Sequence, residues 1–170
     1  MNTPGISDFA PAQHVTTKGL MELWIHDVKV EVLVSAKELS LYDPVLGYRD
    51  LRAAFELGGA STRDNLWVIT AWNPGAIERE ARFNRLDQAR MLLELARDGF
   101  RCFPSRGSAE GWEEPGTAFL SPSGERAAAL AGRFGQLGYY RFSRTEGYCV
   151  DATGHFPETR LSPDKGDPAA

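Results

Sequence analysis

An uncharged run of apolar residues, Leu66–Trp72, is the clearest secondary-structure signal in the chain. It holds β-branched and aromatic residues without polar alternation, which is typical of a strand covered on both faces. Pro74 has no backbone N–H and disfavours helical geometry at Asn73, so the predicted strand ends there. The apolar spacing that follows predicts a long helix over residues 77–98.

This helix has an uneven predicted inner face. At about 100° per residue, one arc collects small and apolar side chains that we expect to face the sheet: Ala81, Ala89, Leu92, Leu93 and Ala96. Arg85 lies in the middle of the same arc, Arg82 lies beside it, and Asn84 lies at its edge. Buried charges need partners, so two interpretations stay open. The polar residues form either a solvated helix end with surface ion pairs or a pocket at the carboxyl end of strand 66–72.

Shorter patterns predict the remaining elements. Residues 28–34 alternate between valine and mostly polar side chains, as in a half-buried strand. Residues 21–25 predict a strand that either forms a hairpin with 28–34 through His26-Asp27 or continues into it with a kink. Further predicted elements are a helix over 48–57 closed by Gly58-Gly59, a strand over 100–104, a polar loop over 105–116, a strand over 117–120, a helix beginning at Ser121-Pro122, and a hairpin of 139–143 with 148–151.

This order of elements predicts an α+β fold, a single domain in which about three helices pack on a mixed β-sheet. The polar, Pro- and Gly-containing ends set the predicted boundaries. They are a flexible N-terminal arm over 1–19, the α+β domain over 20–152, and a disordered C-terminal tail over 153–170.

Composition limits the classes of function. The chain has 170 residues and a net charge of −4, which suits one globular domain and does not favour nucleic-acid binding. It shows no signal-type apolar core and no run long enough to cross a membrane, so we expect a soluble cytoplasmic protein without a membrane partner. The two cysteines, Cys102 and Cys149, cannot define a disulfide framework, and reduced thiols are expected.

Few residues suggest catalytic chemistry. No spacing of His, Cys and carboxylate residues resembles a metal site, so neither a metal nor a cofactor is expected. Glu113 and Glu114 are adjacent, and in an extended segment only one of them can face a pocket. Glu114 is the candidate general acid or base, whereas Cys102 is expected to be a buried strand thiol.

Four short motifs follow one another in the chain: Ile69–Pro74 (ITAWNP), Asn84, Trp112–Pro115 (WEEP) and Arg133–Gln136 (RFGQ). Together they resemble a bacterial family known as domain-of-unknown-function family 3293. Its pattern is an ITAWNP-like strand end, an Asn in the next helix, a W-x-E segment and an F-G-Q helix end. The resemblance covers about 67–140 and implies no activity and no catalytic residue.

The motif positions Asn73, Asn84, Glu114 and Gln136 are all polar. They either line one crevice or satisfy backbone groups at the ends of elements, as caps and ties between loops do.

Two functions therefore remain open, and the sequence leaves open whether the protein is an enzyme. The first is binding of a small polar or anionic ligand at the C-terminal end of strand 66–72, with Glu114 as the catalytic candidate. Its ligand-binding candidates are Asn73, Arg82, Asn84, Arg85, Trp112 and Gln136. The second is a non-catalytic module that binds a protein or a nucleic acid.

Overall fold

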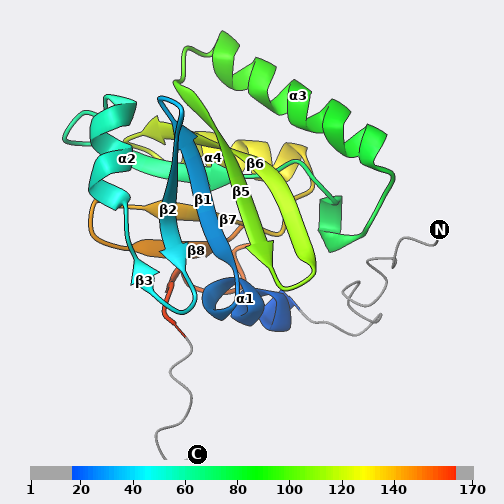
Figure 1. Ribbon diagram of the computed structural model, residues 1–170. Helices are drawn as coiled ribbons and strands as arrows, with labels where there is room; N and C mark the ends of the chain where they lie inside the picture. Colours follow the sequence, from blue (N-terminus) through cyan, green and yellow to red (C-terminus); the bar gives the residue numbers. More distant parts are fainter. Residues whose placement is uncertain (1–16, 164–170) are drawn as a thin grey trace, which may run out of the picture.

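The computed structural model describes residues 17–163, which form a nine-stranded sheet with helices on both faces (Figure 1). The α-helices of this part of the chain are α1 (Thr17–His26), α2 (Leu51–Gly58), α3 (Ala81–Arg97) and α4 (Glu125–Arg133), and a 3₁₀ turn, η2 (Pro74–Ala76), precedes α3. The strands are β1 (Lys29–Val34), β2 (Lys37–Asp43), β3 (Gly47–Tyr48), β4 (Asn65–Ile69), β5 (Cys102–Ala109), β6 (Trp112–Ser121), β7 (Gly138–Phe142), β8 (Gly147–Asp151) and β9 (Thr159–Arg160).

The strands lie in the order β3-β2-β1-β5-β6-β4-β7-β8-β9, and every pair is antiparallel. The α+β class is therefore confirmed, but the expected mixed sheet is wrong. Hairpins join β1 to β2, β5 to β6 and β7 to β8, and hairpins make neighbouring strands antiparallel.

Strand β4 is covered on both faces, as its unbroken apolar pattern predicts. Leu66 and Val68 belong to one buried cluster, which also includes residues of α1 and α2. Trp67 and Ile69 belong to a second cluster, which includes residues of α3 and α4. Helices α1 and α2 therefore cover one face of the sheet, and α3 and α4 cover the other (Figure 1).

The sheet curls until its two edges meet. Tyr48 on edge strand β3 donates its hydroxyl to the carbonyl of Leu161 at 2.6 Å and to that of Gly147 at 2.9 Å. Leu161 follows the opposite edge strand β9 and is fully buried. Side-chain hydrogen bonds of Tyr48 therefore close the curled sheet.

Several expected elements differ from the structure. Residues 21–25 lie in α1 rather than in a strand, because so short an apolar segment fits either period. The hairpin partner of β1 is β2, and both turn residues, Ser35 and Ala36, have positive φ angles of 50° and 60°. The turn contains no glycine, so the sequence gives no usual signal for a hairpin turn here.

The expected polar loop over 105–116 is instead the β5–β6 hairpin, whose turn includes Gly111 with φ 71°. Helix α4 starts at Glu125 rather than after Ser121, which remains in β6. The inner face of α4 consists of Ala127, Leu130 and Ala131, which are buried.

The two predicted terminal segments are only partly within the described residues. Residues 17–19 belong to α1, and residues 153–163 include β9, which pairs with β8. The rest of the predicted arm and tail lies outside the part of the chain that the structure describes.

Candidate functional site

A cavity of about 160 Å³ lies on the inner face of the sheet, beneath α1. Its walls come from β1, β4, β5, β6, β7 and β8, and its mouth is formed by the segment that joins β4 to α3 together with the end of the α4–β7 connection. Most of the lining is apolar. The cavity lies beside the end of the apolar strand, but its lining is not the polar one that was expected, and it extends back along the sheet rather than outward over α3.

The hairpin β5–β6 creates this cavity by pairing large residues with small ones. Across the two strands Glu114 lies opposite Gly107, and Trp112 lies opposite Ala109. Gly116 lies opposite Ser105, and a Cβ atom at Gly116 would come within 2.8 Å of both the Ser105 hydroxyl and the Ile69 carbonyl. The small members leave room into which their larger partners project.

Glu114 of β6 is one of the two charged residues in the described lining of the cavity, and Glu78 is the other. Its neighbour Glu113 points to the opposite face of β6, where it lies 3.8 Å from Arg106. No lysine or arginine is among the described lining residues. Burial consequently raises the pKa of Glu114 from its ordinary 4.5 to about 8, and the Thr70 hydroxyl offsets this only in part. The carboxyl group is therefore mostly protonated at neutral pH.

Ser105 supplies a second polar group to the cavity. Its side chain is 8% exposed, and its Oγ atom has no hydrogen-bond partner among the described residues. A buried hydroxyl without a partner is destabilising, so it commonly indicates a water or ligand position. Together, Ser105 and Glu114 offer two polar groups from adjacent strands in an otherwise apolar space.

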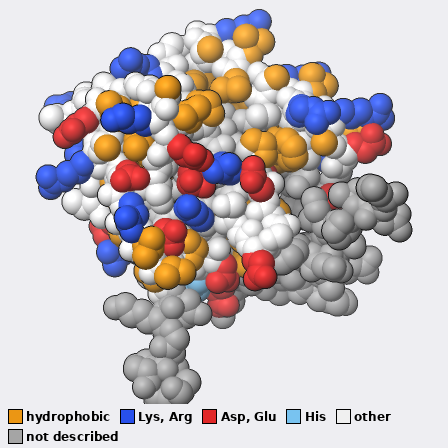
Figure 2. All heavy atoms as spheres, viewed as in Figure 1, with side chains coloured by type: hydrophobic (Ala, Val, Ile, Leu, Met, Phe, Trp, Pro, Cys, Tyr) orange, Lys and Arg blue, Asp and Glu red, His pale blue; other side chains and the backbone are white. Residues whose placement is uncertain are grey.

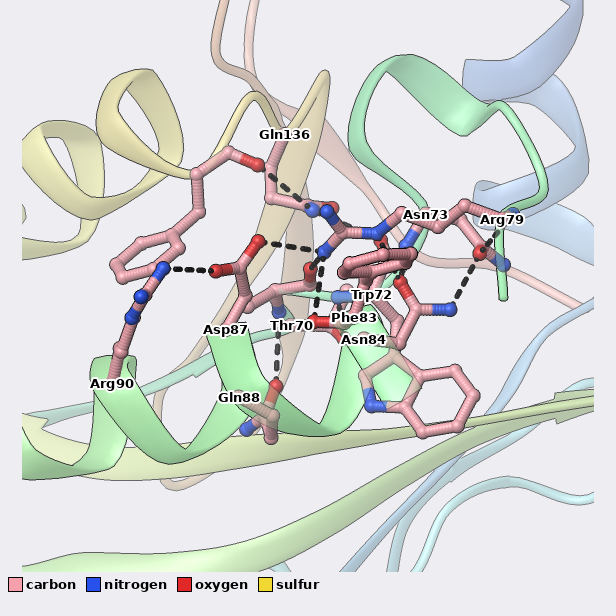
Figure 3. Close-up of polar contacts among 12 residues, drawn as sticks. Thr70, Trp72, Asn73, Arg79, Phe83, Asn84, Asp87, Gln88, Arg90 and Gln136 are labelled. Atoms are coloured by element: carbon pink, nitrogen blue, oxygen red, sulfur yellow. Dashed lines mark hydrogen bonds and ion pairs between the residues drawn. The ribbon is translucent and has the colours of Figure 1, made fainter. Parts of the chain in front are cut away.

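The segment at the mouth is held by a network of amides (Figure 3). Asn84 on α3 is 1% exposed, accepts the backbone N–H of Asn73 at 2.9 Å, and donates to the side-chain oxygen of Asn73 at 2.8 Å. Arg79 donates to Asn84 at 2.7 Å and pairs with Asp87 at 2.7 Å. Asn73 itself has a positive φ of 46°, and this network holds it there.

Two glutamines fix the same segment from other sides. Gln88 accepts the backbone N–H of Ala71 at 2.9 Å and donates to Thr117 on β6 at 2.7 Å. Gln136 donates to the carbonyl of Trp72 at 3.0 Å (Figure 3). The wall of the cavity next to β4 is thus tied to α3, to β6 and to the end of α4.

Most of the residues predicted for the site do converge. Asn73, Trp112, Glu114 and Gln136 all line the cavity. Asn84 lies behind Asn73 and positions it without lining the cavity. Asn73 and Gln136 line the cavity and also form hydrogen bonds to backbone groups.

Arg82 and Arg85 do not contribute to the cavity, and the predicted inner face of the long helix is wrong. Both arginines are exposed, and Arg82 pairs with Glu80 at 2.8 Å. The face that packs on the sheet consists of Asn84, Gln88, Met91 and Leu95. Basic and hydrophobic side chains instead gather on the outer surface over α3 (Figure 2). The buried amides explain the error, since they bond to the backbone and face inward although they are polar.

Several lining residues were not predicted: Trp24, Thr70, Ser105 and Tyr140. Trp24 lies in the segment that was expected to be a strand, and Ser105 in the segment that was expected to be a loop. The alternation of Ser105, Gly107 and Ala109 along one strand face was the available signal, but it requires the hairpin to be recognised first.

Both cysteines are free thiols. Cys149 is buried in the cavity wall, and burial raises its pKa to about 12, so it is not a ready nucleophile. Between residues 17 and 163, no cluster of three or more His, Cys, Asp or Glu side chains could hold a metal ion. No helix in that range is both long and apolar enough to cross a membrane.

Comparison with known families supports the resemblance to domain-of-unknown-function family 3293. A family model described as "Protein of unknown function (DUF3293)" matches residues 69–138. The matched segment runs from the end of β4 through the mouth, α3, the β5–β6 hairpin and α4 to the start of β7. No curated protein and no solved structure matches the chain.

Proposed function

Residues 69–138 belong to a family to which no function is attached, so we propose a function from the cavity alone: the protein binds a small molecule inside the curled sheet. The ligand has a largely apolar body and one polar group that reaches Glu114 and Ser105. A mostly apolar pocket with a few convergent polar groups is the usual form of a small-molecule site.

The observation that carries this proposal is a buried hydroxyl without a hydrogen-bond partner in the same cavity as a carboxyl group without a countercharge. The Ser105 hydroxyl is buried without a partner, and the Glu114 carboxyl faces apolar walls without a basic neighbour among the described lining residues. A bound polar group would satisfy both. The lining does not favour an anionic ligand, since its described charged residues are the acids Glu78 and Glu114.

Glu114 is also suited to proton transfer. A carboxyl group whose pKa is about 8 can act as an acid or a base near neutral pH, where catalytic groups are most effective. Catalysis at Glu114 is therefore the second part of this proposal, and binding is the first.

A thermal-shift screen of small neutral, cationic and anionic compounds tests the binding function. Compounds that bind the folded protein raise its melting temperature according to their concentration and affinity. We expect hits on the natural protein to lose at least half of their shift in Glu114→Gln or Ser105→Ala.

Glu113→Gln is the matched control, because it makes the same chemical change one residue away on the opposite face of β6. Arg85→Ala is the control for the exposed face of α3. Both should keep the full shift. A screen without hits, or hits that respond equally to all four changes, would contradict a site in the cavity.

A further inference from the structure

Three aromatic side chains, those of Trp24, Trp112 and Tyr140, line the same cavity as Glu114. Trp112 shares with Glu114 one face of β6, and its ring lies over Gly107, where an added Cβ would be 3.4 Å away. Trp24 of α1 lies over Gly138, where a Cβ would be 2.8 Å from the indole ring. Tyr140 of β7 contributes a further aromatic ring. The glycines allow these rings to lie directly on the sheet.

This combination has a chemical meaning. The faces of indole and phenol rings attract cations, and such attraction is strongest where water is excluded. A carboxylate adds a full negative charge, whereas a lysine or arginine would cancel the effect, and the described lining has neither. We infer that the ligand is an organic cation, an amine or a quaternary ammonium compound, whose charged nitrogen lies between Glu114 and the rings of Trp24, Trp112 and Tyr140.

This inference rests on the proposed function, because it specifies the ligand of the same cavity. The unpaired Ser105 hydroxyl is independent support for a polar ligand group at this end. A cation also accounts for the isolated carboxyl group. Without a ligand Glu114 has no countercharge and stays protonated, and with a cation beside it the group ionises and releases its proton.

The remaining titratable groups of the cavity do not compete with Glu114. Among the described lining residues they are Tyr139 and Tyr140 on β7, Cys149 on β8, and Glu78 at the exposed mouth. Burial raises the pKa of both tyrosines and of the Cys149 thiol, so all three are neutral at pH 7. Proton release on binding at this pH therefore reports on Glu114.

The test compares cations with neutral molecules of the same shape, by calorimetric titration of the full chain. Choline is paired with 3,3-dimethylbutan-1-ol, and benzylamine with benzyl alcohol. We expect the cation of at least one pair to bind tenfold or more tightly than its neutral partner. Titration in buffers with different ionisation enthalpies should show nearly one proton released per choline bound at pH 7.

Glu114→Gln should remove both the preference for the cation and the proton release, while Glu113→Gln should retain them. The comparison within the natural protein needs no variant, so it stands even if Glu114→Gln fails to fold. Equal or tighter binding of the neutral partners would overturn the inference that the ligand is a cation, but it would leave the proposed binding function of the cavity intact. Binding of only anionic or neutral screen compounds would do the same, and no binding of any compound would overturn both.

Discussion

Asn84 is the residue on which the mouth of the cavity depends. Its buried side chain accepts hydrogen bonds from the backbone N–H of Asn73 and from the guanidinium of Arg79. It also donates a hydrogen bond to the side chain of Asn73. An amide can do this because it combines an acceptor and two donors on one rigid group. No charged or apolar side chain of similar size offers both.

Asn84→Ala should lower the free energy of unfolding by about 2–4 kcal/mol, because it leaves buried polar partners unsatisfied. Urea denaturation measures this change. Arg85→Ala, at the next and exposed position, should change it by less than about 0.5 kcal/mol. A loss at Asn84 no larger than that at Arg85 would show that the network contributes little.

Glu114 gives the protein a distinctive pH dependence. Its pKa is about 8 in the folded chain and near the ordinary 4.5 in the unfolded chain, so the folded state holds one more proton between these values. Stability from this group is therefore full below pH 4.5, falls as the pH rises, and levels off above pH 8.

The glutamine of Glu114→Gln cannot titrate. The melting temperature of this variant should therefore rise relative to that of the natural protein between pH 5 and pH 8, and the difference should be constant at higher pH. Melting curves of the two proteins across this range check the prediction. Curves that run parallel throughout would mean that the carboxyl group is not shielded from water.

At this scale the sequence predicts part of the site. The opposed directions of Glu113 and Glu114 follow from strand geometry alone, and the structure confirms them. Ser105 and Trp24 could not be predicted, because their inward positions depend on which elements they join. Arg85 was misplaced because helix geometry alone does not say which face meets the sheet.

Helix α3 shows how buried amide side chains determine which face of a helix packs on the sheet. Its inner face of Asn84, Gln88, Met91 and Leu95 is half polar, and leucines remain on its outer face. The polar half is stabilised by bonds to the loop backbone, and only the second half packs as a core does. Periodicity predicts that this helix exists. Hydrophobicity alone predicts the wrong buried face when amide side chains point toward the sheet.

Leu95 lies on the inner face of α3, and Leu93 lies on its outer face. Leu95 is 0% exposed and Leu93 is 50% exposed. Leu95→Ala should lower the free energy of unfolding by about 2–5 kcal/mol through the cavity it leaves. Leu93→Ala should lower it by less than about 1 kcal/mol. Chemical denaturation of both variants decides between the observed face and the one that the alanines suggested.

The described part of the chain forms a curled sheet whose edges are joined by Tyr48. Neither the strand order nor this closure could be predicted from local patterns, because β1 meets β5, and β3 meets the segment after β9, across long stretches of chain. The central strand and the final hairpin could be predicted, since one is defined by its own composition and the other by its short turn.

Tyr48→Phe tests the closure. It removes one hydroxyl that donates to the Gly147 and Leu161 carbonyls, and we expect a loss of about 1–3 kcal/mol in the free energy of unfolding. Tyr139→Phe is the control, because its hydroxyl makes no hydrogen bond among the described residues. Hydrogen exchange should also speed up at Leu161, whose N–H bonds to Gly147 at 2.9 Å. Unchanged exchange there would show that the edges hold together without the phenol.

The cavity is shared unequally between the family segment and the rest of the chain. Glu114, Ser105 and the mouth lie inside residues 69–138, whereas Trp24, Val30 and Tyr140 lie outside it. In the proposed function, the family segment supplies the contacts to the polar group of the ligand, and the flanking residues supply part of the apolar wall. We therefore expect changes in the flanking residues to alter which ligand body is accepted, and changes at Glu114 or Ser105 to alter which polar group is recognised.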